Sequence, residues 1–351
     1  MKVYFAGEAG LKEREKRWLE LFSKYLFSFW NIIHGPHQSE STVYTLIKMN
    51  KEIELFLDSG AFSAWTQKKV INVKDYIEFI KKYEDLITVY ANLDVIGDAK
   101  ATWKNQSIME RAGLHPLPVY HRQDNIKYLH RCINEYDYFC LGGMAKGFTA
   151  FDRTSFLDRC FDIICDTPDR LPKCKVHGFG MTSFSLMLRY PWFSVDSTTW
   201  IMTGRMGAIY IPRWVNNKWI YDENSWKITV SNRNPNTKEK GKHLTNSSEE
   251  EKKVFLRYIK EKGYKFGVSE FKKVDSSHKL AENERWAENK TKNPTRDLEI
   301  IIEPGISNTY QLRDEMNIIY FLDLENSRPK WPWPFIKQSA KGLGLDLEGY
   351  E

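Results

Sequence analysis

Apolar residues gather in eight short runs along the first part of the chain, at residues 3–6, 26–33, 53–57, 87–93, 117–120, 138–141, 175–178 and 192–195. Between most of these runs lie stretches with helical spacing, at residues 12–24, 73–83 and 156–164. Strands that alternate with helices predict parallel β/α units. Eight such units predict an α/β fold of the (β/α)8 TIM-barrel type, and we expect it to occupy residues 1–210 as a catalytic domain.

Polar and glycine residues follow most of these runs directly. In a TIM barrel, the side chains that follow the strands form the active-site face. A doubly wound sheet is the rival fold, but no G-x-G-x-x-G pattern opens a helix after the first run. The pattern therefore favours the barrel and places the candidate chemistry in six clusters: Asp58-Ser59-Gly60, Asp94, His121-Arg122-Gln123, Gly142-Gly143-Met144, Gly178-Phe179-Gly180 and Asp196-Ser197.

Beyond residue 205 the pattern changes. Residues 207–212 and 214–221 predict strands, and residues 231–246 predict a loop rich in Asn, Pro, Gly, Lys and Thr. Residues 249–262 predict a helix, with Ser247 or Ser248 as its cap and three glutamates in its first turn. Residues 268–289 predict a polar helix, and residues 298–302 and 318–324 predict strands or short helices. We therefore expect residues 211–351 to form a C-terminal α+β extension.

The charge of the chain is concentrated in this extension. With 42% hydrophobic and 28% charged residues, the chain is expected to fold around a core. Its net charge is +6, and residues 226–295 hold 17 Lys and Arg against 10 Asp and Glu, which leaves the rest close to neutral. A basic segment indicates a surface that faces phosphates. It is equally typical of a solvated region in which Lys is common, so both interpretations stay open.

Neither a targeting segment nor a metal motif stands out. No apolar run approaches the roughly 18 residues of a membrane span, and the N-terminus lacks the parts of a signal peptide. We therefore expect a cytoplasmic protein without membrane contact.

The five cysteines are an odd number, which argues against a disulfide framework. Cys160, Cys165, Cys174 and His177 could supply four zinc ligands, but their spacing fits no tight zinc motif, so we expect neither a metal nor another cofactor.

Two aspartates, Asp58 and Asp196, each stand directly after an apolar run. A carboxylate is costly to bury, so such a residue usually has a role or a strong partner. For each of them, a helix N-cap in the following loop is the ordinary alternative. As a pair across a barrel mouth they suit glycosyl transfer, in which one carboxylate attacks the anomeric carbon and the other transfers the leaving group's proton. Glycines after neighbouring strands favour this interpretation, because they let a flat ligand approach the backbone.

Several motifs resemble those of one enzyme family, the tRNA-guanine (queuine) transglycosylases, and they occur in family order over roughly residues 1–210. Asp58-Ser59-Gly60-Ala61-Phe62 resembles the Asp-Ser-Gly-Gly-Phe signature of that family. Leu141-Gly142-Gly143-Met144-Ala145-Lys146-Gly147 resembles its Gly-Gly-Leu-Ala-x-Gly stretch, and His177-Gly178-Phe179-Gly180 resembles its Met-Gly-x-Gly. Val195-Asp196 matches the position of the family nucleophile, and Thr203-Gly204-Arg205 stands where the family keeps basic residues for phosphates.

The resemblance implies a base-exchange reaction in which a free 7-deazaguanine base replaces guanine in a polynucleotide. Asp196 would attack C1′ and expel guanine, and Asp58 would serve as general acid and then as general base. Asp94 would hold the guanine edge, since a carboxylate can accept from two adjacent N–H groups. Backbone groups of the glycine pair would bind the base O6, and one of the phenylalanines would stack on the base. The implied substrate-binding residues are Asp94, Ser59, Phe62, His121, Gly142, Gly143, His177, Gly178, Phe179 and Arg205.

The departures from the family concern the substrate. His177 replaces a Met, and His121 replaces a Gln. The tRNA enzymes carry a zinc site after the barrel, whereas this chain has no cysteine beyond Cys174. A divergent branch of the superfamily inserts 7-deazaguanines into DNA in bacteria and bacteriophages, and its members often lose the tRNA-binding parts. The resemblance therefore implies DNA as the partner, with tRNA as the alternative. Trp200, Trp214 and Trp219 are candidates either for base stacking or for the core.

Two further functions remain open. One is a glycoside or nucleoside hydrolase, in which Asp58 and Asp196 act with water, although such an enzyme has no use for the Gly142-Gly143 pair. The other is a nucleic-acid binder without catalysis, which would be expected to have lost one of the two aspartates.

Overall fold

The structure is a computed structural model, and it describes residues 1–7, 21, 23–35, 53–144, 149–181, 183–233, 243–287 and 293–337. The chain divides into two compact units. The first unit comprises Met1–Thr198 together with Glu325–Glu351, and the second comprises Thr199–Leu324. Each unit is described by itself below.

The first unit is built on a curled parallel sheet of eight strands, in the order β4-β3-β2-β1-β8-β7-β6-β5. Its two ends meet at a bridge between Ala91 and Leu117, where Leu117 N donates to Tyr90 O and Asn92 N donates to Leu117 O, both at 2.9 Å. This α/β architecture is consistent with a TIM-like barrel, and each predicted run contains a strand. The strands are β1 (Lys2–Ala6), β2 (Lys24–Ser28), β3 (Glu54–Asp58), β4 (Val89–Tyr90), β5 (Val119–His121), β6 (Tyr138–Gly142), β7 (Lys175–Gly178) and β8 (Ser194–Ser197).

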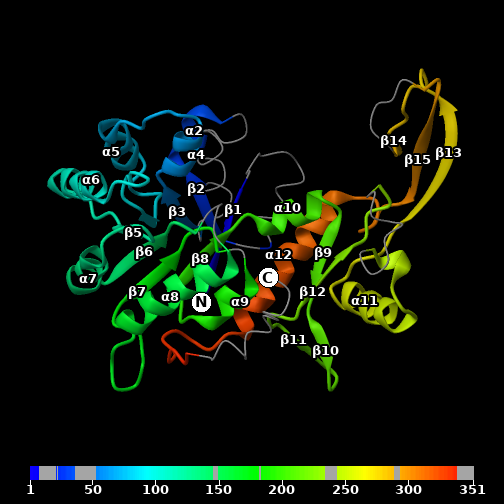
Figure 1. Cartoon of the computed structure of the whole chain (residues 1–351). Coiled ribbons are helices and arrows are strands. Elements are labelled where there is room, and N and C mark those ends of the chain that lie inside the picture. The colour runs from blue at the N-terminus through cyan, green and yellow to red at the C-terminus, as the bar shows by residue number, and fades with distance from the viewer. Residues whose placement is uncertain are drawn as a thin grey trace, which may run out of the picture. The chain divides into compact units, whose positions relative to one another are not determined.

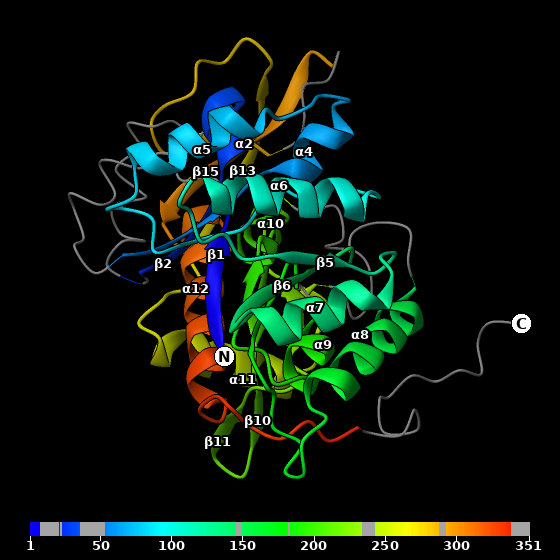
Figure 2. The same cartoon turned by 90° about the vertical axis from the view of Figure 1, so that its left-hand side faces the viewer.

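Helices follow most of the strands and cover the sheet (Figure 1). In Figure 2, α6 and α7 face the viewer outside β5 and β6. The predicted helix at 73–83 is confirmed as α5, which buries Tyr76, Ile77, Phe79 and Ile80 on one side. The helices of this unit are α2 (Phe29–His34), α4 (Ala61–Thr66), α5 (Val73–Lys82), α6 (Ala99–Arg111), α7 (Ile126–Glu135), α8 (Ala150–Ile164) and α9 (Phe184–Arg189).

The apolar run at 26–33 contains two elements, because Ser28 ends β2 and caps α2. The Ser28 hydroxyl accepts from Asn31 N at 3.4 Å, which starts the helix in the middle of the run. The helix expected at residues 12–24 falls mostly outside the described residues, and Lys24 belongs to β2.

The interior of the curled sheet is a continuous apolar core. Side chains of a strand alternate between its two faces, so every second residue points inward. Strands buried on both faces form nearly unbroken apolar runs, which is why these strands were visible in the sequence. The core cluster comprises Tyr4, Ala6, Leu26, Phe56, Ala91, Leu117, Val119 and Cys140, with Tyr138 and Phe179 packed against it.

The second unit is an α+β arrangement with its own core. In it, β12 pairs antiparallel with β9, and the apolar side of α11 packs in the same cluster as these strands. The predicted helix at 249–262 is confirmed as α11, with Ser248 as cap and Glu251 completing a capping box. Its elements are α10 (Thr199–Arg205), β9 (Ala208–Ile211), β10 (Arg213–Val215), β11 (Lys218–Ile220), β12 (Trp226–Thr229), a 3-10 turn (Leu244–Asn246), α11 (Glu249–Glu261), β13 (Val268–Asp275), β14 (Glu284–Trp286), β15 (Thr295–Glu303) and α12 (Tyr310–Ser327).

The polar helix predicted for residues 268–289 is wrong. This stretch forms β13 and β14, which flank β15 in an antiparallel sheet, seen as the long yellow and orange strands of Figure 1. β13 pairs with β15 along its whole length, from Val268 to Asp275. The polar composition suits a strand that is exposed for most of its length, and pairing with a distant segment overrides local propensity.

The structure refines other predicted segments as well. The strand predicted at 214–221 is a hairpin of β10 and β11, because Asn216 and Asn217 adopt positive φ angles of 48° and 59°. Asn tolerates this conformation and turns the chain. Residues 298–302 lie in β15, whereas residues 318–324 lie in α12. Of the loop predicted at 231–246, residues 234–242 lie outside the described part of the chain.

The longest helix of the chain, α12, has 18 residues and buries the charged side chains of Arg313, Asp314 and Glu315. Among the residues that the structure describes, none of the helices combines the length and the apolar character that a bilayer crossing requires.

Candidate active site

Three aspartates lie at the carboxyl edge of the curled sheet. Asp58 ends β3, Asp196 lies in β8, and Asp94 follows β4. The carboxyl ends of parallel strands meet at one edge of a sheet, which is the usual place for an active site in α/β proteins. The structure therefore brings together the three carboxylates that the sequence singled out.

Asp58 is the carboxyl group most perturbed by its surroundings. Burial, followed by the negative charges of Asp94 and Asp196, raises its pKa to about 8. The Gly60 N–H, which donates to Asp58 Oδ2 at 3.0 Å, opposes this shift without cancelling it. Gly60 has φ of 79°, and a Cβ there would lie 2.3 Å from Ser28 Oγ, so glycine is required to shape this turn. At neutral pH, Asp58 holds a proton that it can donate.

Asp196 is buried, and both donors that it faces lie at one of its oxygens. Gly180 N donates to Asp196 Oδ1 at 2.8 Å, and His177 Nε2 lies 3.3 Å from the same atom. Within the described residues, no donor holds Oδ2. The carboxylate is therefore held at Oδ1, and Oδ2 has no hydrogen-bond donor among the described residues that would compete with its use as a nucleophile.

Asp94 is held by two neighbours that were also predicted as site residues. Ser59 Oγ donates to Asp94 Oδ1 at 3.0 Å, and His121 Nε2 lies 3.0 Å from Oδ2. Burial lowers the pKa of His121, but the hydrogen bond and charge of Asp94, together with the charge of Asp124, raise it above its usual value overall. When it is protonated, His121 balances the negative charge of Asp94.

Two neighbouring glycines make room for His121. A Cβ at Gly142 would lie 2.8 Å from His121 Cδ2, and Gly143 adopts φ of 80°. A side chain at either position would displace His121 or strain the backbone. The glycine pair therefore also serves the placement of His121, in addition to the backbone contact with the base that the resemblance implies.

The remaining predicted residues of the first unit fall into two groups. Phe62, on α4, is 45% exposed, so its ring is free to meet a ligand. Phe179 instead packs against Phe56 and His177, with ring centroids 5.9 and 4.8 Å apart. Gly178 faces Trp192, whose ring atoms would lie 3.0 Å from an added Cβ. Phe62 is thus the more accessible stacking candidate, whereas Gly178 is required for packing.

Arg205 and the three tryptophans belong to the second unit. Arg205 ends α10, and Trp200 on the same helix is buried. The rings of Trp214 and Trp219 lie 4.5 Å apart, and Trp219 Nε1 donates to Glu261. The burial of Trp200 favours a core role for that residue.

Sequence reasoning missed a chain of hydrogen bonds beneath Asp196. Tyr138 OH lies 2.6 Å from Ser194 Oγ, which lies 2.7 Å from His177 Nδ1. One signal was present in the sequence, since Ser194 stands two residues before Asp196 and therefore points to the same face of β8. Asp124, whose carboxylate accepts from His121 N at 3.0 Å, was also missed.

The cysteines do not form a metal site within the described residues. All five are buried free thiols, and burial raises the pKa of Cys160, Cys165 and Cys174 to about 12. The part of the chain that the structure describes contains no group of three or more His, Cys, Asp or Glu side chains placed to hold a metal.

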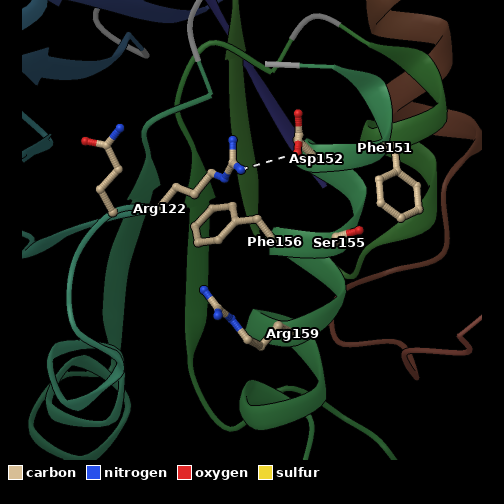
Figure 3. Close-up of a pocket in the computed structure, with 7 residues that line it drawn as sticks. Arg122, Phe151, Asp152, Ser155, Phe156 and Arg159 are labelled. Carbon is tan, nitrogen blue, oxygen red and sulfur yellow. Dashed lines mark hydrogen bonds and ion pairs between the residues drawn. The ribbon is translucent and has the colours of Figure 1, made fainter. Parts of the chain in front are cut away.

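A hollow of about 380 Å³ is lined by the segment after β5 and by α8, and one of its lining residues, Arg122, directly follows His121 in the sequence (Figure 3). Arg122 comes from the segment after β5 and pairs with Asp152 of α8 at 3.5 Å. Phe151, Ser155, Phe156 and Arg159 line the hollow from α8. Two guanidinium groups against one carboxylate give this hollow a positive character.

Comparisons with known proteins do not identify a family. No protein-family model matches the chain, and no curated protein matches it. A solved structure from Aquifex aeolicus VF5, described only as a structural study of a project ID, is 12% identical and covers 57% of this chain and 84% of that chain, with a TM-score of 0.38. A TM-score at this level carries no argument about fold or function.

Proposed function

We propose that this protein is a glycosyltransferase that exchanges guanine in DNA for a free 7-deazaguanine base. In this proposal the curled sheet is a (β/α)8 TIM barrel, the second unit is a basic nucleic-acid-binding extension, and the protein acts in the cytoplasm. The observation that carries the proposal is that Asp58, whose pKa burial raises to about 8, and Asp196, whose Oδ2 has no donor among the described residues, lie at the same edge of the sheet. A proton donor and a carboxylate nucleophile are the two groups that a retaining glycosyl transfer needs.

The exchange runs in two steps, and the enzyme regains in the second the proton that it gives up in the first. Asp196 Oδ2 attacks C1′, the bond from C1′ to the guanine nitrogen breaks, and the departing base takes the proton of Asp58. In the second step, Asp58 removes a proton from the incoming base, whose nitrogen bonds to C1′. The bond between C1′ and Asp196 then breaks, and its electron pair returns to the carboxylate. Asp58 thus acts as acid and then as base, and the enzyme ends as it began.

Labelled 7-deazaguanine, offered with DNA, with tRNA or with no polymer, tests this proposal. Incorporation into DNA supports it, and incorporation into tRNA alone supports the alternative tRNA enzyme. Release of guanine with no incorporation of label would indicate a hydrolase instead, since water would then have replaced the incoming base. Binding without either reaction would indicate a nucleic-acid binder.

Replacing Asp94 with Ala is expected to raise the KM for the base strongly and to relax its selectivity. The carboxylate offers acceptors for two adjacent N–H groups of a guanine-like base, and donors left unpaired in a buried site cost about 1–3 kcal/mol. The measurement is exchange kinetics with guanine and with analogues that lack the 2-amino group.

The control for Asp94→Ala is Asp85→Ala, because Asp85 is an exposed aspartate outside the site. Asp85→Ala should leave both KM and selectivity unchanged. If Asp94→Ala lowered only kcat, Asp94 would belong to the proton-transfer machinery rather than to base recognition.

The basic segment at 226–295 is expected to give DNA binding a strong dependence on salt. Some of its cations are already paired, such as Lys265 with Glu303 and Arg285 with Glu299. Each phosphate that the segment neutralises adds about −0.9 to the log–log salt slope on duplex DNA and about −0.7 on single strands. Reversing the charge of four exposed lysines should make the slope shallower, and these lysines are Lys253, Lys260, Lys273 and Lys279.

Binding to matched DNA and tRNA between about 50 and about 200 mM salt measures this effect. Reversal of four exposed lysines on α5, α6 and α7 gives a matched control with the same change in net charge, at Lys74, Lys81, Lys104 and Lys127. An unchanged slope in the first variant, or tighter and productive binding of tRNA, would remove the DNA assignment for this segment.

A further inference from the structure

His177 is a buried group that has no part in the two steps of the proposed base exchange. Its ring is fully buried and is packed between aromatic neighbours, with Phe56 at 4.4 Å and Phe179 at 4.8 Å between ring centroids. These contacts fix the plane of the ring, so its two nitrogens face constant partners. Nδ1 faces Ser194 and Nε2 faces Asp196.

The hydrogen bonds beneath the ring determine which nitrogen carries the proton. Among the described residues, Ser194 Oγ is the one hydrogen-bond partner of the Tyr138 hydroxyl, at 2.6 Å, so we infer that the phenol donates to it. The Ser194 proton then points to His177 Nδ1, which must accept it. The ring proton of a neutral His177 therefore sits on Nε2. The opposite arrangement would set the lone pair of Nε2 against a carboxylate oxygen at 3.3 Å.

A purely structural role for His177 does not explain the surroundings of its Nε2 atom. A core histidine is ordinarily satisfied at both nitrogens, yet Nε2 is buried and makes no aligned hydrogen bond among the described residues. The acceptor that it faces is Asp196 Oδ1. Catalytic hydrogen bonds are often poorly aligned in the free enzyme and tighten only when substrate binds.

We propose that His177 is a positioning residue for Asp196: as a neutral imidazole with its proton on Nε2, it joins the Gly180 N–H in holding Oδ1, which leaves Oδ2 as the atom that attacks C1′. This inference rests on the proposed function. It also assigns His177 to the nucleophile rather than to the base.

The two donors act most strongly when the covalent intermediate breaks down. In the glycosyl-enzyme, Oδ1 is the carbonyl oxygen of an ester and carries little charge. When the incoming base displaces Asp196, the electron pair of the C1′–Oδ2 bond returns to the carboxylate, and charge develops on Oδ1. The N–H groups of His177 and Gly180 stabilise that charge, as donors of an oxyanion hole do. Loss of the His177 donor therefore slows breakdown more than formation.

The first test does not depend on catalysis. In the full-length protein labelled with ¹⁵N-histidine, the His177 signals are assigned among the eight histidines by their loss in His177→Gln. We expect the chemical shifts of a neutral ring with a protonated Nε2 and an unprotonated Nδ1. A ring protonated on Nδ1 alone, or on both nitrogens, would overturn the inference whatever reaction the protein catalyses.

The second test compares His177→Leu with His177→Gln during exchange. The Leu variant lacks a donor, whereas the Gln amide retains an N–H at the end of its side chain. With incoming base present, we expect breakdown of the covalent adduct to slow by about ten- to a hundredfold in His177→Leu, the size of one lost hydrogen bond to a charged group. The adduct should therefore accumulate in His177→Leu, and the Gln variant should recover most of the rate.

The outcomes separate the two proposals. If the wild-type protein forms no adduct and exchanges no base, the proposed function fails, and the tautomer remains to be judged by the labelled histidine. If the wild type forms an adduct but His177→Leu slows formation and breakdown equally, or if Gln does not recover the rate, His177 is structural. Thermal denaturation of each variant checks that it is folded at the assay temperature.

Discussion

Asp196→Asn is expected to abolish both the covalent adduct and base exchange. The amide is nearly isosteric with the carboxylate, and its oxygen can still accept from Gly180 N, so the site should keep its shape. An amide cannot form the ester to C1′, and loss of a covalent nucleophile can lower turnover by about 10⁶-fold. The measurement is denaturing electrophoresis of enzyme incubated with DNA and without incoming base, together with label exchange.

Asp85→Asn is the matched control for this variant, since it makes the same chemical change on the surface. It should form the adduct at the wild-type rate. Base exchange that persists in Asp196→Asn would contradict the covalent route and assign the attack to water or to another carboxylate, with Asp94 the first to examine.

Asp58→Asn is expected to lower turnover by about 10²–10⁴-fold, the usual contribution of a general acid. Because a pKa of about 8 leaves Asp58 protonated at neutral pH, wild-type kcat/KM should be level below that pH and fall as pH rises through it. The Asn variant should lack this descending limb, since it carries no proton to lose. A pH–rate profile of both proteins measures the effect.

Stability provides an independent check on Asp58. Between the usual carboxyl pKa of 3.8 and about 8, the folded protein keeps a proton that the unfolded chain has released. Wild-type stability therefore falls as pH rises across this window. Asp58→Asn removes this contribution to the pH dependence, so the Tm of the variant relative to wild type should rise steadily from about pH 4 towards pH 8. A margin independent of pH would mean that Asp58 is not buried in its neutral form.

The strands were predictable because each is short, nearly unbroken in apolar character and closed by a polar or glycine cluster. The failed predictions have two causes, one in pairing with a distant segment and one in a local helix cap. Residues 268–289 carry no periodic pattern that distinguishes a strand from a polar helix. The partner that makes β13 a strand lies between 20 residues (Asp275 with Thr295) and 35 residues (Val268 with Glu303) further along the chain. Ser28 divided one apolar run into a strand and a helix through a single capping hydrogen bond.

The candidate site was likewise predictable from the sequence only in part. Asp58, Asp94 and Asp196 could be predicted because a carboxylate directly after an apolar strand is recognisable from the sequence alone. The chain from Tyr138 through Ser194 to His177 was not visible, because it crosses three strands, and none of these residues is unusual in its own segment. The raised pKa of Asp58 likewise depends first on its burial in the folded protein and then on the nearby charges of Asp94 and Asp196, none of which local sequence shows.

The bridge between Ala91 and Leu117 has a consequence for how the site behaves over time. β1 pairs with β8 at four register positions, whereas the two ends of the sheet meet at this one bridge. Asp94 follows Ala91 along the chain, and His121 follows Leu117. The 3.0 Å contact between His121 Nε2 and Asp94 Oδ2 therefore also links the two ends of the sheet. Local opening requires the least free energy where backbone hydrogen bonds are fewest. Among the described residues, we therefore expect the sheet to open most readily at this bridge, and a base held by Asp94 would rigidify the sheet at that place.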